Sequence, residues 1–320
     1  MKMSRLFDAL QRSEGELAGV DSPVPSEATE LIRRAEQRAA SQWEAAENVA
    51  APATAPVPAT VSVLAKSDDL RPQTRPANFS GFQSLTLSFA PQDRLVCFDD
   101  SESAAAEAFR LLGVRIRHLR RDRPLKRVLI TSTIQQEGKS TVAENLAGTL
   151  AHTTQQKVLL IDGDHRRPAI SAVFQLISSP GLNDYLRGEQ EIEKCIYHLE
   201  GHSLWILPAG NIRANVLELL QSMQLSELIE QLSSWFDWIV IDSPPVLPLA
   251  DTSVWARLAD GILIVARQGV TQRRHLQKGL EALETKKTIG ALLNCSTNLA
   301  YGGYYYGSAY FSKGARPSAD

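Results

Sequence analysis

Six short apolar runs recur along the chain from about residue 127 onward. They lie at about 127–132, 157–162, 204–208, 237–242, 260–266 and 288–294, with segments of helical pattern between them. Short, nearly continuous apolar runs are typical of strands buried on both faces, as in parallel sheets. The alternation therefore predicts an α/β fold, with a mostly parallel sheet covered by helices on both faces.

The first run leads into a segment that predicts a phosphate-binding loop. Residues 126–141 read KRVLITSTIQQEGKST, and a helical pattern follows at once. Backbone N–H groups at the start of a helix bind anions, and the helix dipole favours negative charge there. We expect nucleotide contacts from Gln136, Glu137, Gly138, Lys139, Ser140 and Thr141. Lys139 can reach the outer phosphates, and the Ser140 hydroxyl can ligate Mg²⁺. The fold expected is therefore that of a P-loop NTPase.

The loop departs from the usual G-x-x-x-x-G-K-[ST] pattern. Thr133 stands where the pattern has its first glycine, and Gln135 and Gln136 precede Glu137. A positive φ at Gln136 would cost roughly 1 kcal/mol for a non-glycine residue. The alternative for the segment alone is an ordinary strand–loop–helix connection.

Two further apolar runs each end on an aspartate. Residues 157–168 read KVLLIDGDHRRP, which places Asp162 at the strand end and Asp164 two positions on, and residues 237–245 read DWIVIDSPP, with Asp242. Ligands of open parallel sheets bind at the carboxyl ends of strands. Beside a phosphate loop, these carboxylates predict a Mg²⁺–nucleotide site with Ser140, Asp162 and Asp242 as metal ligands. Singly, each aspartate could be a helix cap or turn former. His165 is expected to be a solvent-facing loop residue.

The segments EGKST, LLIDGDHRRP and WIVIDSPP together resemble the bacterial tyrosine kinases of capsular and exopolysaccharide synthesis. The resemblance covers about residues 100–310. It implies an ATP- and Mg²⁺-dependent, non-specific protein-tyrosine kinase, in which Asp162 accepts the tyrosine proton and Asp164 is a second carboxylate of the site. Asn294, which ends the last apolar run, could contact the nucleotide base as its counterpart does in related P-loop ATPases; the alternative is a turn residue. The family also carries E-x-x-R-x-x-R for ring assembly. Glu107 and Arg110 match it, but Gly113 replaces the last arginine. We therefore expect self-association, but the sequence does not predict a ring.

The C-terminal segment is rich in tyrosine, glycine and serine. Its tyrosines are Tyr301, Tyr304, Tyr305, Tyr306 and Tyr310, in the sequence YGGYYYGSAYF. Such a composition predicts a flexible tail that can enter an active site in extended form. Given the resemblance, these tyrosines are the expected phosphoacceptors. Without the P-loop, the segment would be interpreted as an aggregation-prone aromatic tail.

Composition and linkers suggest three parts. Residues 1–90 form a partly disordered extension with short helices and the Pro/Ala linker AAPATAPVPAT, 91–298 the kinase domain, and 299–320 the tail. The net charge is only −2, so no general attraction to nucleic acid or anionic membrane is implied. The three cysteines are widely spaced and form no CxxC, which favours reduced thiols and a cytoplasmic location. No apolar run is long enough to span a membrane. Residues 110–127 hold eight basic side chains and one acidic one, but no aromatic or DNA-reading pattern accompanies them, so nucleic acid is not an expected partner.

Three functions remain open at this stage. The first is a cytoplasmic tyrosine autokinase that regulates polysaccharide synthesis and export. It would be recruited to the inner face of the membrane by a membrane-embedded activator, and its other partners would be protein tyrosine substrates and a phosphatase. The second is a ParA/MinD-like positioning ATPase, but these carry K-G-G-x-G-K, whereas this chain has Ile134, Gln135 and Gln136 at the distinguishing positions. The third is a non-catalytic nucleotide-binding scaffold of the export machinery.

Overall fold

The computed structural model describes residues 79–87, 89, 94–98, 103–154, 156–211, 216–247, 250–283 and 285–296. The predicted tyrosine-rich tail and most of the predicted N-terminal extension lie outside these residues. Within them, no helix is both long enough and apolar enough to cross a bilayer. Cys97, Cys195 and Cys295 are free thiols.

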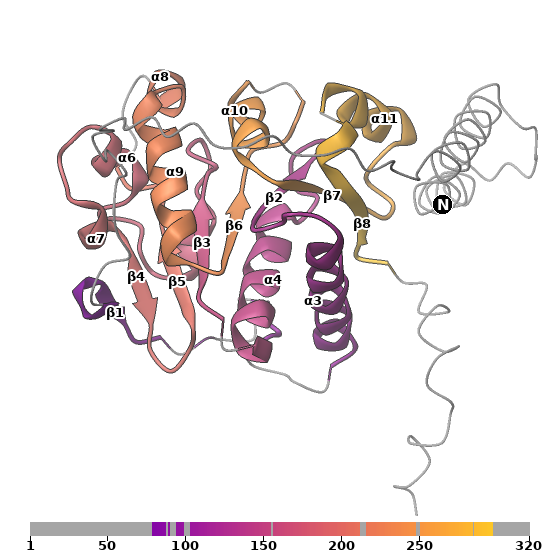
Figure 1. The fold of residues 1–320 in the computed structure, drawn as a ribbon. Coiled ribbons are helices and arrows are strands. Elements are labelled where there is room, and N and C mark those ends of the chain that lie inside the picture. Colours follow the sequence, from indigo (N-terminus) through magenta and orange to yellow (C-terminus); the bar gives the residue numbers. More distant parts are fainter. Residues whose placement is uncertain are drawn as a thin grey trace, which may run out of the picture.

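An eight-stranded sheet organises the described chain (Figure 1). Its strands are β1 (Gln83–Leu85), β2 (Arg127–Ser132), β3 (Val158–Asp162), β4 (Tyr197–Leu199), β5 (Leu204–Leu207), β6 (Trp238–Asp242), β7 (Gly261–Arg267) and β8 (Thr288–Asn294). Their order is β1-β4-β5-β3-β6-β2-β7-β8, and only the β4–β5 pair is antiparallel. The prediction of a mostly parallel α/β sheet is confirmed.

Helices and short helical turns connect these strands. They are η1 (Phe79–Gly81), α3 (Ala104–Asp122), α4 (Lys139–Thr154), α5 (Ile170–Val173), α6 (Leu182–Leu186), α7 (Ile192–Cys195), α8 (Val216–Leu220), α9 (Met223–Trp235), α10 (Asp251–Leu258), α11 (Arg273–Ala282) and η3 (Thr285–Lys287). Ser103 caps α3 by accepting a hydrogen bond from Ala106 N, and Ser222 caps α9 in the same way through Leu225 N.

Alternate residues of the central strands feed two cores on opposite faces of the sheet. Leu129 and Leu159 join the core under α9, α10 and α11, whereas Val128 and Val158 join the core under α3 and α4. Figure 1 shows α3 and α4 side by side, and Gly113 of α3 lies at their contact. A Cβ at Gly113 would lie 3.2 Å from Thr149 Cγ2 of α4. The glycine that departs from the family's arginine pattern is therefore buried in the α3–α4 contact.

The six predicted strands match β2, β3, β5, β6, β7 and β8 within one residue at each end. The two strands that the sequence did not reveal, β1 and β4, are three residues each. β1 pairs with β4 and lies before residue 91, so the sheet begins earlier than the predicted start of the kinase domain.

Candidate nucleotide site

The P-loop between β2 and α4 is held in shape by the buried carboxylate of Glu137. Its oxygens accept hydrogen bonds from Thr133 N at 2.7 Å and Ile134 N at 2.9 Å, and from the hydroxyls of Thr133 and Thr271. Thr133, which departs from the glycine pattern, thus contributes both its N–H and its hydroxyl to the loop. The Glu137 side chain faces inward, so its expected nucleotide contact would come from the backbone.

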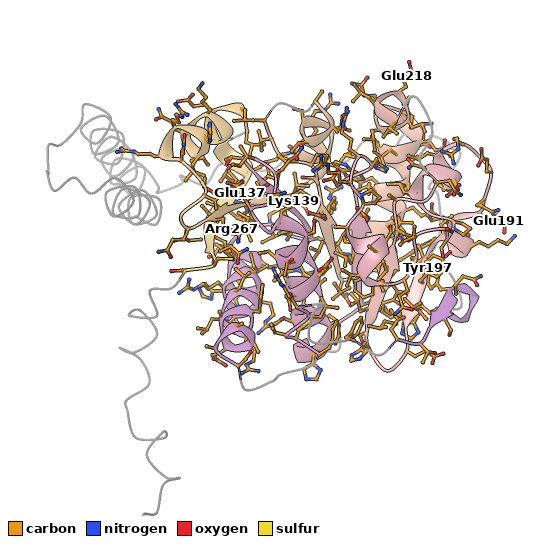
Figure 2. All side chains as sticks on the ribbon, turned by 180° about the vertical axis from the view of Figure 1, so that it is seen from behind. Glu137, Lys139, Glu191, Tyr197, Glu218 and Arg267 are labelled. Carbon is orange, nitrogen blue, oxygen red and sulfur yellow. The ribbon has the colours of Figure 1, made fainter. Side chains whose placement is uncertain are left out.

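The residues after Ile134 adopt the strained conformation that the sequence suggested. Gln136 has φ of 65°, the left-handed region, and Gly138 has φ of 88°. Arg267 at the end of β7 donates from Nη1 to Gln136 O at 3.1 Å, and Asn294 donates from Nδ2 to Glu137 O at 3.0 Å. Figure 2 shows Glu137, Lys139 and Arg267 close together. The C-terminal ends of β7 and β8 therefore brace the loop, which offsets the cost of its backbone.

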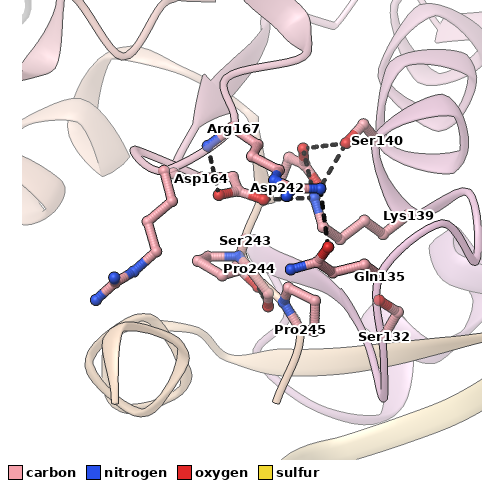
Figure 3. Close-up of polar contacts among 12 residues, drawn as sticks. Ser132, Gln135, Lys139, Ser140, Asp164, Arg167, Asp242, Ser243, Pro244 and Pro245 are labelled. Carbon is pink, nitrogen blue, oxygen red and sulfur yellow. Dashed lines mark hydrogen bonds and ion pairs between the residues drawn. The ribbon is translucent and has the colours of Figure 1, made fainter. Parts of the chain in front are cut away.

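Lys139 lies at the centre of a charged cluster (Figure 3). Its Nζ is 2.8 Å from Asp164 Oδ2, 3.6 Å from Asp242 Oδ2 and 3.2 Å from Ser140 Oγ. The Ser140 hydroxyl donates to Asp242 Oδ2 at 2.6 Å. Burial alone would lower the pKa of Lys139, but Asp242 and Asp164 outweigh it and raise that pKa. The lysine is therefore a fixed positive charge.

Asp162 and Asp242 are brought together by strand register. They pair directly across β3 and β6, and both side chains are fully buried. Oδ2 of Asp162 accepts hydrogen bonds from Ser171 N and Oγ, whereas Oδ1 of each aspartate has no hydrogen-bond partner in the described chain. Burial and the Asp242 charge raise the pKa of Asp162 to about 8. Burial likewise raises the pKa of Asp242 to about 6, with Lys139 opposing the shift.

These features fit a Mg²⁺–nucleotide. Asp162 and Asp242 each keep one buried oxygen that has no partner in the described chain, and the other oxygen of Asp242 binds the Ser140 hydroxyl in the first turn of the 16-residue helix α4. Within the described residues, no group of three or more His, Cys, Asp or Glu side chains is arranged to hold a metal unaided. Mg²⁺ is usually held by one or two carboxylates together with substrate phosphates, and a helix N-terminus supplies phosphate donors. The donor set therefore suits a metal shared with bound phosphate.

The structure thus gathers Lys139, Ser140, Asp162, Asp164 and Asp242 in one place, with Thr141 in the first turn of α4. Asn294 contacts the loop backbone through its amide, and its Oδ1 accepts from Cys295 N. Glu107 and Arg110 form an exposed ion pair at 2.7 Å on α3. The five tail tyrosines lie outside the described residues.

Sequence reasoning missed several residues that shape the site. Ser171 binds Asp162, Thr271 and Arg267 brace the P-loop, and Arg167 donates from Nη1 to Gln135 Oε1 at 2.8 Å. The two consecutive arginines after Asp164 could have indicated a role for Arg167 at the site. No feature of the local sequence indicated one for Ser171 or Thr271.

The expectation for His165 was wrong. Its side chain is 1% exposed, and its ring lies parallel to that of Trp255, 6.4 Å away between centroids. Helix α10 covers the loop after β3, since Trp255 also donates from Nε1 to Gly163 O.

Comparison with known proteins gives the family. A P-loop, two strand-end carboxylate segments and a parallel sheet define a P-loop nucleotide-binding protein, and a family model described as "AAA domain" matches residues 134–292. The chain is 34% identical over 222 residues to tyrosine-protein kinase YwqD of Bacillus subtilis, covering 68% of this chain and 92% of YwqD. The chain therefore belongs to the bacterial tyrosine kinases.

Two further relatives agree with this assignment. The chain is 34% identical over 202 residues to tyrosine-protein kinase ptk of Acinetobacter johnsonii, where the match spans 62% of this chain but 27% of that longer protein. The solved kinase domain of Escherichia coli tyrosine kinase ETK aligns with a TM-score of 0.60 at 26% identity, over 70% of this chain and 93% of that domain. Kinase function is thus favoured over the positioning ATPase and the non-catalytic scaffold.

Proposed function

We propose that this chain transfers the γ-phosphoryl group of ATP to tyrosine hydroxyls, first those of its own tail at Tyr301, Tyr304, Tyr305, Tyr306 and Tyr310. The observation that carries the proposal is the cluster of Lys139, Ser140, Asp164 and Asp242 at the start of α4. Phosphoryl transfer depends mainly on positioning and on neutralising charge, which is what such a cluster supplies.

Each residue has a role in this proposal. Lys139 neutralises the β- and γ-phosphates, and the backbone N–H groups of residues 136–141 cradle them. Ser140, Asp242 and Asp162 are the residues that would hold Mg²⁺, which would supply further charge neutralisation. Asn294 lies beside the loop, where a base contact is expected.

The tyrosine oxygen attacks the γ-phosphorus, the bond from that phosphorus to the bridging oxygen breaks, and ADP leaves. The tyrosine proton needs an acceptor, because a free tyrosine has a pKa of about 10. Asp162 is the proposed acceptor, because its buried carboxylate pairs with Asp242 across β3 and β6 and keeps one oxygen without a partner in the described chain. Asp164, paired with Lys139, holds that lysine in position until phosphate replaces it.

The wider role follows from the family. We infer that the kinase regulates capsule or exopolysaccharide synthesis from the cytoplasm, where a membrane-embedded partner recruits and activates it and a phosphatase reverses its action. Self-association would use the exposed face of α3, where Glu107 and Arg110 pair beside the exposed Leu111 and Val114. Added phosphates bring roughly −1.5 to −2 charges each, so phosphorylation of the adjacent tail tyrosines should loosen the assembly.

Incubation with Mg-ATP tests the proposal. The expected result is phosphotyrosine that mass spectrometry places in residues 301–310. Tyr197 serves as an internal comparison, because it is buried, its hydroxyl donates to Pro180 O, and it lies far from Lys139 (Figure 2). Absence of phosphotyrosine in the presence of the recruiting partner would favour the scaffold, and phosphate confined to Tyr185 or Tyr197 would exclude the tail as acceptor. Sizing before and after ATP tests the switch, and an unchanged assembly would remove it.

A further inference from the structure

A small pocket lies at the C-terminal part of α3, away from the nucleotide site. It has a volume of about 200 Å³ and is lined by Arg117, Arg120, Arg121, Gln156 and Trp238. Trp238 is the first residue of β6, whereas Asp242 at the other end of that strand belongs to the nucleotide site. The pocket therefore opens at the opposite edge of the sheet.

The pocket has a rigid floor. Trp238 is fully buried, and its Nε1 donates to Gln156 Oε1 at 2.8 Å. The Arg120 guanidinium lies over the Trp238 ring, with Cζ 4.5 Å from the ring centroid. Stacking on an aromatic face fixes the guanidinium plane and leaves its N–H groups free to donate.

The positive charge of the pocket is not balanced by the described residues. Arg117, Arg120 and Arg121 follow i, i+3 and i+4 spacing, so like charges face one another, which is unfavourable on a helix. None of the three forms an ion pair with a carboxylate of the described chain. Nη1 of Arg117 is buried without a hydrogen-bond partner there. A bound anion would relieve the repulsion among the three guanidinium groups.

We propose that this pocket binds a phosphotyrosine side chain. Guanidinium groups match the geometry of phosphate oxygens and bind them in pairs of parallel hydrogen bonds. An aromatic ring attached to that phosphate can stack on the planar Arg120 side chain. The volume is below the roughly 300–1,000 Å³ of pockets for drug-sized ligands, so it suits one side-chain head group rather than a nucleotide.

The source of the phosphotyrosine is the chain's own tail, a step that rests on the proposed function. β8 and β6 are three strands apart, and their opposite ends are separated by roughly 25–30 Å. Ten residues separate Asn294 from Tyr304, and ten extended residues span about 33–36 Å. A phosphorylated tail can thus reach the pocket of its own subunit and keep the modified tyrosines away from the nucleotide site.

Fluorescence anisotropy with a labelled synthetic peptide of residues 299–311 tests the pocket. The peptide is used unphosphorylated and with phosphotyrosine at 304–306, against the full, phosphatase-treated chain. We expect the phosphopeptide to bind at least about tenfold more tightly, since hydrogen bonds between charged partners are the strong ones. Because the phosphate is added synthetically, failure here is independent of whether the chain is a kinase.

Variants locate the binding site. Arg121→Gln and Arg120→Gln are expected to weaken phosphopeptide binding about tenfold or more, whereas Arg115→Gln, exposed on the other side of α3, should change it less than about twofold. Equal losses in all three variants would mean general attraction and would overturn the proposal. So would equal competition by inorganic phosphate and phenyl phosphate. Loss of binding to phosphatidylglycerol vesicles but not to phosphopeptide in Arg121→Gln would instead assign the surface to a membrane.

Discussion

Asp162 is a carboxylate that the fold makes unfavourable to ionise, so Asp162→Asn should stabilise the protein while removing phosphotransfer. Its side chain is fully buried, and burial, then the Asp242 charge, raises its pKa to about 8. A group that binds its proton more tightly when folded lowers the free energy of unfolding as pH rises from its unfolded pKa to its folded pKa. Asparagine does not titrate, so the variant lacks this loss.

The size of the effect follows from the two pKa values, 3.8 unfolded and about 8 folded. At 1.36 kcal/mol per unit, the raised pKa lowers the free energy of unfolding of the wild type by about 2 kcal/mol at pH 5 and about 5 kcal/mol at pH 8, relative to a residue that does not titrate. The difference in free energy of unfolding between Asp162→Asn and wild type should therefore widen by about 3–4 kcal/mol across this range and then become constant. This is an upper limit, because water and side-chain relaxation reduce the penalty of a buried charge.

Urea denaturation followed by circular dichroism from pH 5 to pH 9, without Mg²⁺ or nucleotide, measures this difference. Any pH-independent effect of the introduced amide group cancels, because the quantity compared is how the difference in free energy of unfolding changes with pH. The matched control is Asp260→Asn, at the residue just before β7. Burial alone would raise the pKa of Asp260, but hydrogen bonds from Arg127 and from the N–H groups of Arg127 and Lys126 lower it overall. Stabilisation by Asp260 is thus fully present above pH 4 and is lost only in acid.

Asp260→Asn should accordingly destabilise by about 1–3 kcal/mol with no trend from pH 5 to pH 8. The reasoning is refuted if the difference in free energy of unfolding between Asp162→Asn and wild type stays constant with pH. It is also refuted if that difference changes with pH to the same extent for Asp260→Asn. Retained phosphotransfer by a folded Asp162→Asn protein would separately remove Asp162 as the proton acceptor.

Two other predictions concern the P-loop. Lys139→Ala should lower phosphotyrosine formation roughly 10²–10³-fold while the circular dichroism spectrum persists, because one stabilising charge is lost at the transferred phosphate; undiminished transfer would end the assignment of the loop. Gln136→Gly should be neutral or stabilise by up to about 1 kcal/mol, since it removes the strain of φ 65°. Gly138→Ala should instead destabilise by about 2 kcal/mol or more, because its Cβ would meet Asn294 Nδ2. Thermal denaturation of the two variants checks the pair, and a similar loss in both would contradict the backbone argument.

The fold was predictable from sequence because each central strand is buried on both faces and is therefore continuously apolar. β1 and β4 were not predicted, because each has only three residues, which are too few to show an apolar pattern. The nucleotide site was predictable for a related reason. Its residues lie at strand ends and at a helix start, positions that local sequence reveals and that a parallel sheet places on one edge.

Residues that act through tertiary contact were not predictable. Glu137 looked like a phosphate-loop residue, but its carboxylate turns inward because Thr271, far along the chain, meets it there. Nothing in the local sequence of Thr271 marks that contact. The strain at Gln136 was foreseen as a conditional cost, whereas its brace from Arg267 depends on the neighbouring position of β7 and β2 in the sheet.

His165 shows the limit most clearly, and it changes how the loop after β3 should be tested. Burial lowers its pKa to about 4, with Asp251, Asp164 and the neighbouring Asn183 opposing the shift, so the ring is neutral near pH 7. Neither ring nitrogen lies within hydrogen-bond distance of a partner in the described chain. Truncation to alanine would leave a cavity worth about 2–5 kcal/mol, but removing an unsatisfied polar group returns about 1–3 kcal/mol. We therefore expect His165→Ala to destabilise by only about 1–3 kcal/mol. His165→Phe should destabilise less, since a phenyl ring can keep the stack on Trp255.

Urea denaturation at pH 7 compares the two variants, and phosphotyrosine formation is measured on each folded protein. His165→Ala should lower phosphotransfer partly, because the cavity loosens the loop that carries Asp164, and His165→Phe should restore it. Greater instability of His165→Phe than of His165→Ala would show that the ring nitrogens are satisfied and that polarity, not packing, is what this position requires.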